Sequence, residues 1–215
     1  MVQHYIHRGL INKNFQENTI KAFKHSFTRK YGIETDIHAT KDHEFICFHD
    51  FTLNRIFRKK ISVKNMEYSK IKKISAQNKK PIPLLKDLLK TSKNKYPLFI
   101  EIKPTFTKKL LQKLLRETSK FSKCIFISFK HENIYNLLKL KGNIKVGLSF
   151  APPTSVKSII KKSSNKKIDC LVMDKFYLKN KSIQSLNLKK YYYTIKTRAE
   201  FKKYNKNYNL IFENL

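Results

Sequence analysis

Apolar residues in this chain follow two alternating patterns. Short apolar runs bounded by turn residues are typical of buried strands, whereas apolar positions three or four apart are typical of amphipathic helices. The predicted strands cover residues 2–6, 33–38, 98–102, 124–128, 145–150, 169–173, 190–195 and 209–212. The predicted helices cover 20–31, with Gly32 as the stop, then 84–91, 107–119, 134–138, 154–163, 180–187 and 197–204.

This alternation of strand and helix predicts the fold class. Strands joined by helical crossovers run parallel. Eight of them predict an α/β fold, the (β/α)8 TIM barrel, with little or no eighth helix after 209–212. An open doubly wound sheet is the competing fold, but no glycine-rich phosphate loop follows the first strand. We expect a single domain over 1–215, in which the basic, aperiodic residues 51–80 form an insertion or lid over the barrel mouth.

The chain is strongly basic. It has 47 Lys and Arg against 15 Asp and Glu, a formal charge of +32. Much of this reflects a composition rich in residues with A/T-rich codons, but the resulting field also favours phosphate-bearing small molecules and anionic membrane surfaces. The lysines are scattered and no nucleic-acid-binding motif accompanies them, so we expect no specific nucleic-acid partner. A non-catalytic protein that binds nucleic acid or membranes through its basic surface is the less favoured alternative.

The cysteines and the hydropathy of the chain indicate the cellular compartment of the protein. Cys47, Cys124 and Cys170 each lie alone in an apolar run, which predicts buried thiols in a reducing compartment and no zinc pair. The N-terminal residues lack the apolar region of a signal peptide, and no apolar run is long enough to span a bilayer. We therefore expect a soluble, cytoplasmic protein, whose oligomeric state the sequence leaves undetermined.

Two carboxylates lie two residues apart in the predicted strand 33–38. Glu34 and Asp36 therefore project from the same face, where they repel each other unless a cation lies between them. Glu101 stands near the end of another strand, and in a barrel the carboxyl ends of the strands meet at one mouth. Hard oxygen ligands suit Mg²⁺ or Ca²⁺. We predict a shared divalent cation, while an exposed acidic strand edge is the alternative for the pair Glu34 and Asp36 alone.

Two histidines and two basic residues fall at the same strand ends. His7 and Arg8 follow the first strand, and Lys103 closes the strand that carries Glu101. His49 ends a short extra strand. The histidines can exchange protons near neutral pH, and the basic side chains can hold a phosphate. With a metal, this set supports phosphoryl transfer. Taken singly, each residue has an ordinary alternative, such as a Glu101–Lys103 salt bridge on one strand face.

The order of these residues resembles the glycerophosphodiester phosphodiesterase family. The motifs that carry the resemblance are HRG (7–9), ENT with AF (17–19, 22–23), E-x-D-x-x-x-TKD (34–42), HD with R (49–50, 55), IP-x-L (82–85), IEIK (100–103) and SF (128–129). The resemblance covers residues 4–150 well and the remainder weakly. The long block from the E-x-D motif through HD is the most specific part.

The resemblance implies a TIM barrel that uses a divalent cation, Mg²⁺ or Ca²⁺, to hydrolyse glycerophosphodiesters to sn-glycerol 3-phosphate and an alcohol. It also implies that the glycerol 2-hydroxyl is an internal nucleophile. It assigns roles to seven positions: metal ligands Glu34, Asp36 and Glu101, the acid/base pair His7 and His49, and phosphate contacts Arg8 and Lys103. A lysophospholipase D-like phosphodiesterase that acts at anionic membranes is the alternative within the superfamily.

The sequence departs from the family pattern at four places. Gln16 replaces the proline before ENT, and His43 replaces the glycine after TKD. Residues 193–196 read YTIK where the family has WTVN, and 212–215 read FENL in place of TD-x-P. The departures spare all seven site positions, so we expect an active enzyme, and the loss of the family's Trp and Asn leaves its choice of substrate open.

Overall fold

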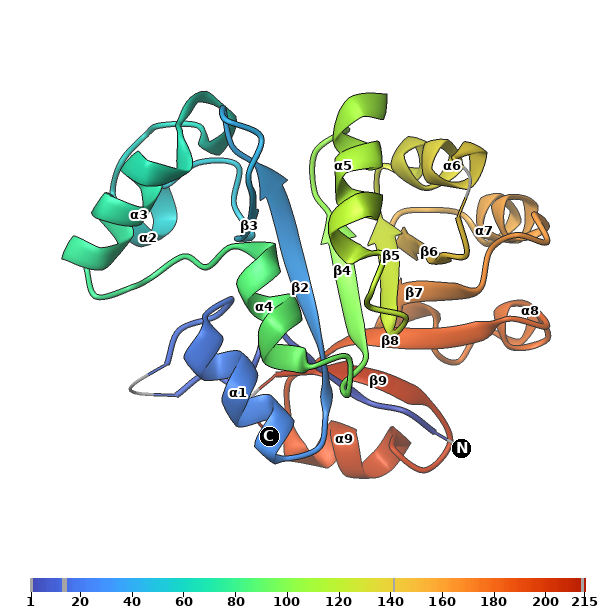
Figure 1. Cartoon of the computed structure of the whole chain (residues 1–215). Coiled ribbons are helices and arrows are strands. Elements are labelled where there is room, and N and C mark those ends of the chain that lie inside the picture. Colours follow the sequence, from blue (N-terminus) through green and yellow to red (C-terminus); the bar gives the residue numbers. More distant parts are fainter. Residues whose placement is uncertain (1, 13–14, 141, 214) are drawn as a thin grey trace.

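Eight parallel strands form a closed ring in the computed structural model of the chain, which describes residues 2–12, 15–140, 142–213 and 215. The ring closes because β1 (Tyr5–His7) pairs with both β2 (Gly32–Ala39) and β9 (Asn209–Phe212). The strands between them are β4 (Leu98–Ile102), β5 (Cys124–Ser128), β6 (Lys145–Phe150), β7 (Cys170–Asp174) and β8 (Lys189–Ile195). The closed ring confirms the TIM barrel and excludes the open doubly wound sheet (Figure 1).

Helices connect successive strands on the outside of the ring (Figure 1). α1 (Ile20–Thr28) joins β1 to β2 and packs against α4 (Leu85–Ser92), which precedes β4. The helices that precede β5 to β9 are α5 (Lys108–Thr118), α6 (His131–Lys139), α7 (Val156–Ser163), α8 (Lys181–Gln184) and α9 (Arg198–Tyr204). In the described part of the chain no helix follows β9, in agreement with the expected lack of an eighth helix. None of the described helices is long and apolar enough to cross a bilayer.

Two boundaries differ from those predicted near the site. The first helix ends at Thr28, so Gly32 does not stop it but opens β2. Glycine is needed there because a Cβ atom at Gly32 would lie 2.6 Å from the carbonyl oxygen of Pro97. β1 begins later than predicted and includes His7, which stands opposite Glu34 in the parallel register.

The interior of the ring is filled by side chains that the strands point inward. Tyr5, Phe99 and Tyr191 pack their rings against one another, with centroids 4.4 to 5.5 Å apart. Ile127 and Val172 belong to the same buried cluster. The barrel is thus a packed core, and polar chemistry is confined to its ends. All three cysteines are buried and free, as predicted.

Residues 51–80 fold into a small lobe beside the barrel (Figure 1). The chain enters it through β3 (Phe45–Cys47), which pairs antiparallel with β2. The lobe contains α2 (Asn54–Phe57), the 3₁₀ helix η1 (Val63–Asn65) and α3 (Tyr68–Gln77). It has its own apolar cluster, composed of Ile46, Phe48, Leu53, Phe57, Val63, Met66, Ile71, Ile82 and Leu84. A lid function for this segment stays a prediction.

Candidate active site

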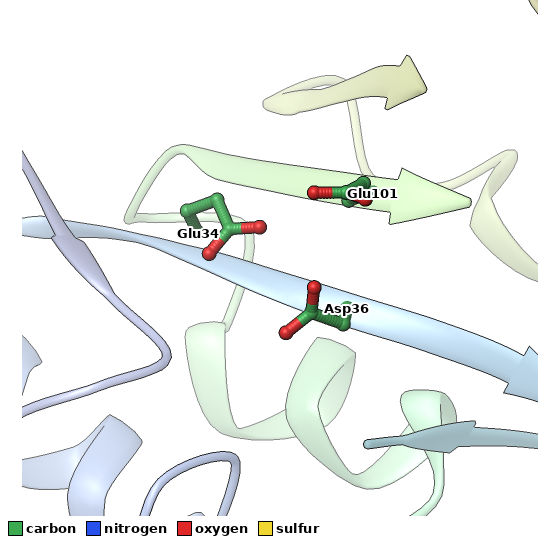
Figure 2. Close-up of side chains that lie close together, drawn as sticks. All are labelled: Glu34, Asp36 and Glu101. Carbon is green, nitrogen blue, oxygen red and sulfur yellow. The ribbon is translucent and has the colours of Figure 1, made fainter. Parts of the chain in front are cut away.

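The carboxylates of Glu34, Asp36 and Glu101 lie together toward the carboxyl ends of β2 and β4 (Figure 2). Glu34 and Asp36 share one face of β2, and Asp36 stands opposite Glu101 in the parallel register. One oxygen from each of the three lies within 4.8 Å of the others. All three side chains are buried. The alternative of an exposed acidic edge is therefore wrong.

Two cations contact two of these three carboxylates, Asp36 and Glu101. The ammonium nitrogen of Lys103 lies 2.8 Å from Oε1 of Glu101 and 3.4 Å from Oδ1 of Asp36. Nε of Arg8 lies 3.1 Å from Oδ2 of Asp36. Three negative charges therefore face two positive ones, and the cluster carries one excess negative charge when all are ionised.

The pKa values of the carboxyls reflect this imbalance. Burial alone would raise the pKa of Asp36, but the charges of Arg8 and Lys103 outweigh it and hold the pKa at about 2. Burial, reinforced by the charge of Asp36, raises the pKa of Glu101 to about 7. Burial and the two neighbouring carboxylates raise the pKa of Glu34 well above its usual range. The cluster therefore needs either bound protons or an additional cation.

A divalent cation fits the donor set. Oε2 of Glu34 and Oδ1 of Asp36 are buried and accept no hydrogen bond, although each lies near a basic side chain. A buried acceptor without a partner costs about 1–3 kcal/mol. A metal ion held by Glu34, Asp36 and Glu101 would satisfy these oxygens and cancel the excess charge. An all-oxygen set of carboxylates suits Mg²⁺ or Ca²⁺.

His7 is oriented by a carboxylate that the sequence did not reveal. Its Nδ1 atom lies 2.6 Å from Oε1 of Glu213, which follows β9. Its Nε2 atom faces Glu34 at 3.7 Å. The hydrogen bond with His7 is the main reason that the pKa of Glu213 lies below its usual value. An ionised Glu213 accepts the proton of Nδ1, which leaves Nε2 directed at the carboxylate cluster.

His49 belongs to a chain of ion pairs. Its Nδ1 atom lies 2.7 Å from Asp50, whose other oxygen accepts a hydrogen bond of 2.6 Å from Nε of Arg55. Arg55 also donates to Glu17, and Glu17 in turn faces Arg8 at 3.4 Å. Asp50 therefore orients the histidine. Burial, with the charge of Arg8 in addition, lowers the pKa of His49.

Two buried polar residues, Asn18 and His38, form hydrogen bonds to site residues. The side-chain amide of Asn18 donates to Asp36 at 3.1 Å and its oxygen accepts from Thr35 at 2.7 Å. His38, next after Asp36 on the strand face, is not part of the carboxylate cluster. Its Nε2–H donates to the carbonyl oxygen of His49 at 3.1 Å, and burial lowers its pKa to about 4. The motif ENT includes Asn18 but did not indicate its partners Asp36 and Thr35.

A cavity of about 290 Å³ opens at this end of the barrel. It is lined by all the predicted site residues except Asp36, namely His7, Arg8, Glu34, His49, Glu101 and Lys103. Its apolar side includes Ile127, Val172 and Phe129. A larger cavity of about 800 Å³ lies around the opposite strand ends, but none of the seven predicted residues lines it. The smaller cavity is therefore the candidate active site.

Comparison with known proteins shows a family relationship. The model of the Glycerophosphoryl diester phosphodiesterase family matches residues 7–208. The chain belongs to this family. A glycerophosphodiester phosphodiesterase of Caldanaerobacter subterraneus subsp. tengcongensis is 32% identical over 159 residues, which cover 67% of this chain and 65% of that protein. The chain thus matches just under two thirds of that relative's length.

Solved structures of the glycerophosphodiester phosphodiesterase family share the fold. The enzyme of Thermotoga maritima superposes with a TM-score of 0.84 at 18% identity, over 100% of this chain and 95% of that one. A phosphodiesterase of Oleispira antarctica, solved in complex with sn-glycerol-3-phosphate, gives 0.81 at 18% identity, over 99% and 92%. At this identity the likeness establishes the common barrel.

Two of the four departures from the family pattern lie at the cavity and at one turn. Tyr193 and Thr194, from the YTIK segment, line the cavity next to a register shift between β8 and β9. The hydroxyl of Tyr193 donates to the carbonyl of Phe150 at 2.8 Å. His43 has a φ of 62°, the left-handed conformation that glycine adopts without strain. Its N–H bonds to Thr40 and closes the turn without a glycine.

Proposed function

We propose that the protein is a metal-dependent phosphodiesterase that hydrolyses glycerophosphodiesters to sn-glycerol 3-phosphate and an alcohol. The observation that carries this proposal is the buried cluster of Glu34, Asp36 and Glu101, which has two oxygens without hydrogen bonds and lies beside His7. Membership of the family supports it, as does the sn-glycerol-3-phosphate bound to the Oleispira antarctica relative.

In this proposal Glu34, Asp36 and Glu101 hold the divalent cation, Mg²⁺ or Ca²⁺. A bound divalent ion supplies charge stabilisation to the phosphate and lowers the pKa of a nearby hydroxyl. Arg8 and Lys103, which line the cavity, bind the phosphate oxygens. Because both also contact Asp36, the same two side chains link the phosphate to the carboxylate cluster.

The two histidines move the protons. The lowered pKa of His49 keeps its ring neutral near pH 7, so that it can accept a proton from the attacking hydroxyl. His7 gives a proton to the leaving alcohol as the phosphorus–oxygen bond breaks. Each ring is held at Nδ1 by a carboxylate, Asp50 or Glu213, and presents its other nitrogen to the reaction. The attacking hydroxyl is the glycerol 2-hydroxyl, and water then opens the cyclic phosphate.

The test is release of glycerol 3-phosphate from glycerophosphocholine or glycerophosphoethanolamine. We expect activity with Mg²⁺, Ca²⁺ or Mn²⁺ and its loss with EDTA. His49→Gln is the active-site control, and a matched surface variant, Glu132→Gln on α6, should retain activity. Protein that is inert toward several head groups with each of the three metals would contradict the proposal.

A substrate with an acyl chain is the second candidate. Phe129 lines the cavity and is 40% exposed, so one wall can contact an apolar group. This corresponds to lysophospholipase D-like chemistry at an anionic membrane, and lysophosphatidylcholine is the diagnostic substrate. The cytoplasmic location expected from the sequence stays a prediction.

A further inference from the structure

Exposed hydrophobic side chains gather around the mouth of the barrel. In the described part of the chain, the large hydrophobic residues with exposed side chains are Phe51, Ile61, Phe129, Ile160 and Phe176. All except Ile160, which lies on α7, belong to segments that follow the carboxyl ends of strands. Isolated surface hydrophobics are ordinary, but a group of them at one opening indicates an interaction site.

These four side chains come from three separate connections around one opening. Phe51 follows His49, and Ile61 is held beside it because the carbonyl of Phe51 accepts from Val63 and that of Ile61 accepts from Leu53. The Phe51 ring is 53% exposed. This segment follows β3, on the side of the cavity where His49 lies.

The other two side chains, Phe129 and Phe176, follow β5 and β7, which lie two and four strands away from β2 in the barrel. Phe129, directly after β5, packs edge-on to the cavity residue Tyr193, with centroids 6.0 Å apart. Phe176, directly after β7, is 73% exposed. It lies in the 3₁₀ helix η2 (Lys175–Tyr177), and the last residue of β7, Asp174, stands opposite Tyr193 in the strand register. Phe129 thus contacts a residue of the cavity wall, and Phe176 follows the strand that pairs with the segment carrying that residue.

Basic residues accompany each of these apolar side chains. Lys59 and Lys60 precede Ile61, Lys130 follows Phe129, and Lys179 follows η2. All four lysines are exposed, and among the described residues none of them forms an ion pair. In contrast, Lys175 is neutralised by Glu200 at 2.5 Å. The mouth rim, defined as Phe51, Ile61, Phe129, Phe176 and these four lysines, is therefore both apolar and cationic.

We propose that the mouth rim docks on the surface of an anionic lipid bilayer. Aromatic rings partition into the interfacial region of bilayers, and lysines beside them are attracted to anionic head groups. The charge of the rim is complementary to such a surface, whereas a neutral apolar partner would leave four lysines unpaired. In this orientation the cavity opens toward the lipid head groups. The consequence for catalysis rests on the proposed function in its second form, with a substrate that carries an acyl chain: the protein then takes a phosphodiester that is held in a membrane.

The test is cosedimentation of the purified chain with phosphatidylcholine vesicles, with and without phosphatidylglycerol. We expect binding to the anionic vesicles only, and weaker binding at high salt. Two matched pairs of variants separate the rim from the overall charge of the protein. Ile61→Ser with Phe176→Ser removes apolar side chains of the rim, and Ile160→Ser is its control. The double variant Lys130→Gln/Lys179→Gln removes two lysines of the rim. Its control is the double variant Lys145→Gln/Lys189→Gln, which removes the first residues of β6 and β8.

The expected result is a loss of vesicle affinity of about tenfold or more for each rim variant and little change for its control. Equal losses for the two lysine pairs would overturn the proposal, because binding would then follow the net charge alone. Absence of binding to anionic vesicles would also overturn it. Thermal unfolding midpoints equal to that of the unmodified chain confirm that the variants are folded.

Hydrolysis in vesicle-free buffer separates this proposal from the proposed function. We expect Ile61→Ser with Phe176→Ser to cleave glycerophosphoethanolamine as fast as the unmodified protein, because neither residue lines the cavity. Vesicle binding without any hydrolysis would contradict the proposed function and support docking. Hydrolysis without vesicle binding would support the proposed function and contradict docking.

Discussion

Nδ1 of His7 and Oε1 of Glu213 lie 2.6 Å apart, although 206 residues separate them in the sequence. They meet because β9 pairs with β1 as the barrel closes. Closure of the ring is therefore what directs Nε2 of His7 at Glu34. His49 is likewise held at Nδ1 by a carboxylate, but its partner Asp50 is the next residue in the sequence.

Glu213→Gln tests this relationship. The amide can still contact His7, but it no longer stabilises a positive charge on the ring. We expect kcat to fall about tenfold or more, with KM nearly unchanged, since Glu213 does not line the cavity. Glu132→Gln, an exposed change on α6, is the matched control. A fall in activity that appears only in KM would speak against a positioning role.

His49→Gln tests the proton transfer. We expect a loss in kcat of about 10²–10⁴-fold, because a general base is removed. Metal binding should persist, since His49 is not among the clustered carboxylates. The measurement is steady-state hydrolysis alongside the metal-induced rise in unfolding temperature. His25→Gln on α1 provides a histidine control. If His49→Gln retained full kcat, the assignment of His49 would be wrong.

The raised carboxyl pKa values predict how the stability of the metal-free protein depends on pH. Burial and Asp36 raise the pKa of Glu101 to about 7, so the folded state keeps a proton that the unfolded chain releases above its ordinary pKa of 4.5. This contribution is present below the unfolded pKa and is lost as pH rises through about 7. It amounts to roughly 3 kcal/mol in the free energy of unfolding.

Denaturant unfolding of EDTA-treated protein between about pH 5 and about pH 8 measures this dependence. We expect Glu101→Gln to lose much of the fall in stability over that range, because glutamine does not titrate. The comparison between the two proteins removes the contribution of other groups, such as His38. Parallel curves for the two proteins would contradict the expected pKa shift.

The turn at His43 predicts a pattern of stability changes. His43 is exposed and has a φ of 62°, so substitutions there act through the backbone. We expect His43→Val to lower the free energy of unfolding by about 1–2 kcal/mol, because a β-branched residue is poorly tolerated in this conformation. His43→Gly should change it by less, since relief of strain is offset by a more flexible unfolded chain. Thermal unfolding measures both, and equal effects would contradict this account.

The core of the carboxylate cluster was predictable because it depends on two simple rules. Residues two apart in a strand share a face, which joins Glu34 to Asp36. The carboxyl ends of barrel strands meet at one mouth, which brings Glu101 to them. Both rules need only the positions of the strands, and the short apolar runs of the sequence indicate those positions.

Other parts of the site depend on contacts that no local pattern encodes. Glu213 reaches His7 only through barrel closure, and Asn18 reaches Asp36 from the connection between β1 and α1. The lobe 51–80 showed no clear period because several of its buried residues, such as Phe57 and Val63, lie on helices of only three or four residues. Gly32 was misinterpreted as a helix stop, because a glycine required by close packing against Pro97 cannot be distinguished in the sequence from a glycine that ends a helix.

Glu34, Asp36 and Glu101 are expected to share one divalent cation. Isothermal titration of the EDTA-treated protein with Mg²⁺ and Ca²⁺ measures this binding without substrate. We expect one ion to bind per chain. Binding should be lost in Glu34→Gln, Asp36→Asn and Glu101→Gln and retained in Glu213→Gln. Absence of binding by the unmodified protein, or binding that survives all three carboxylate substitutions, would contradict it.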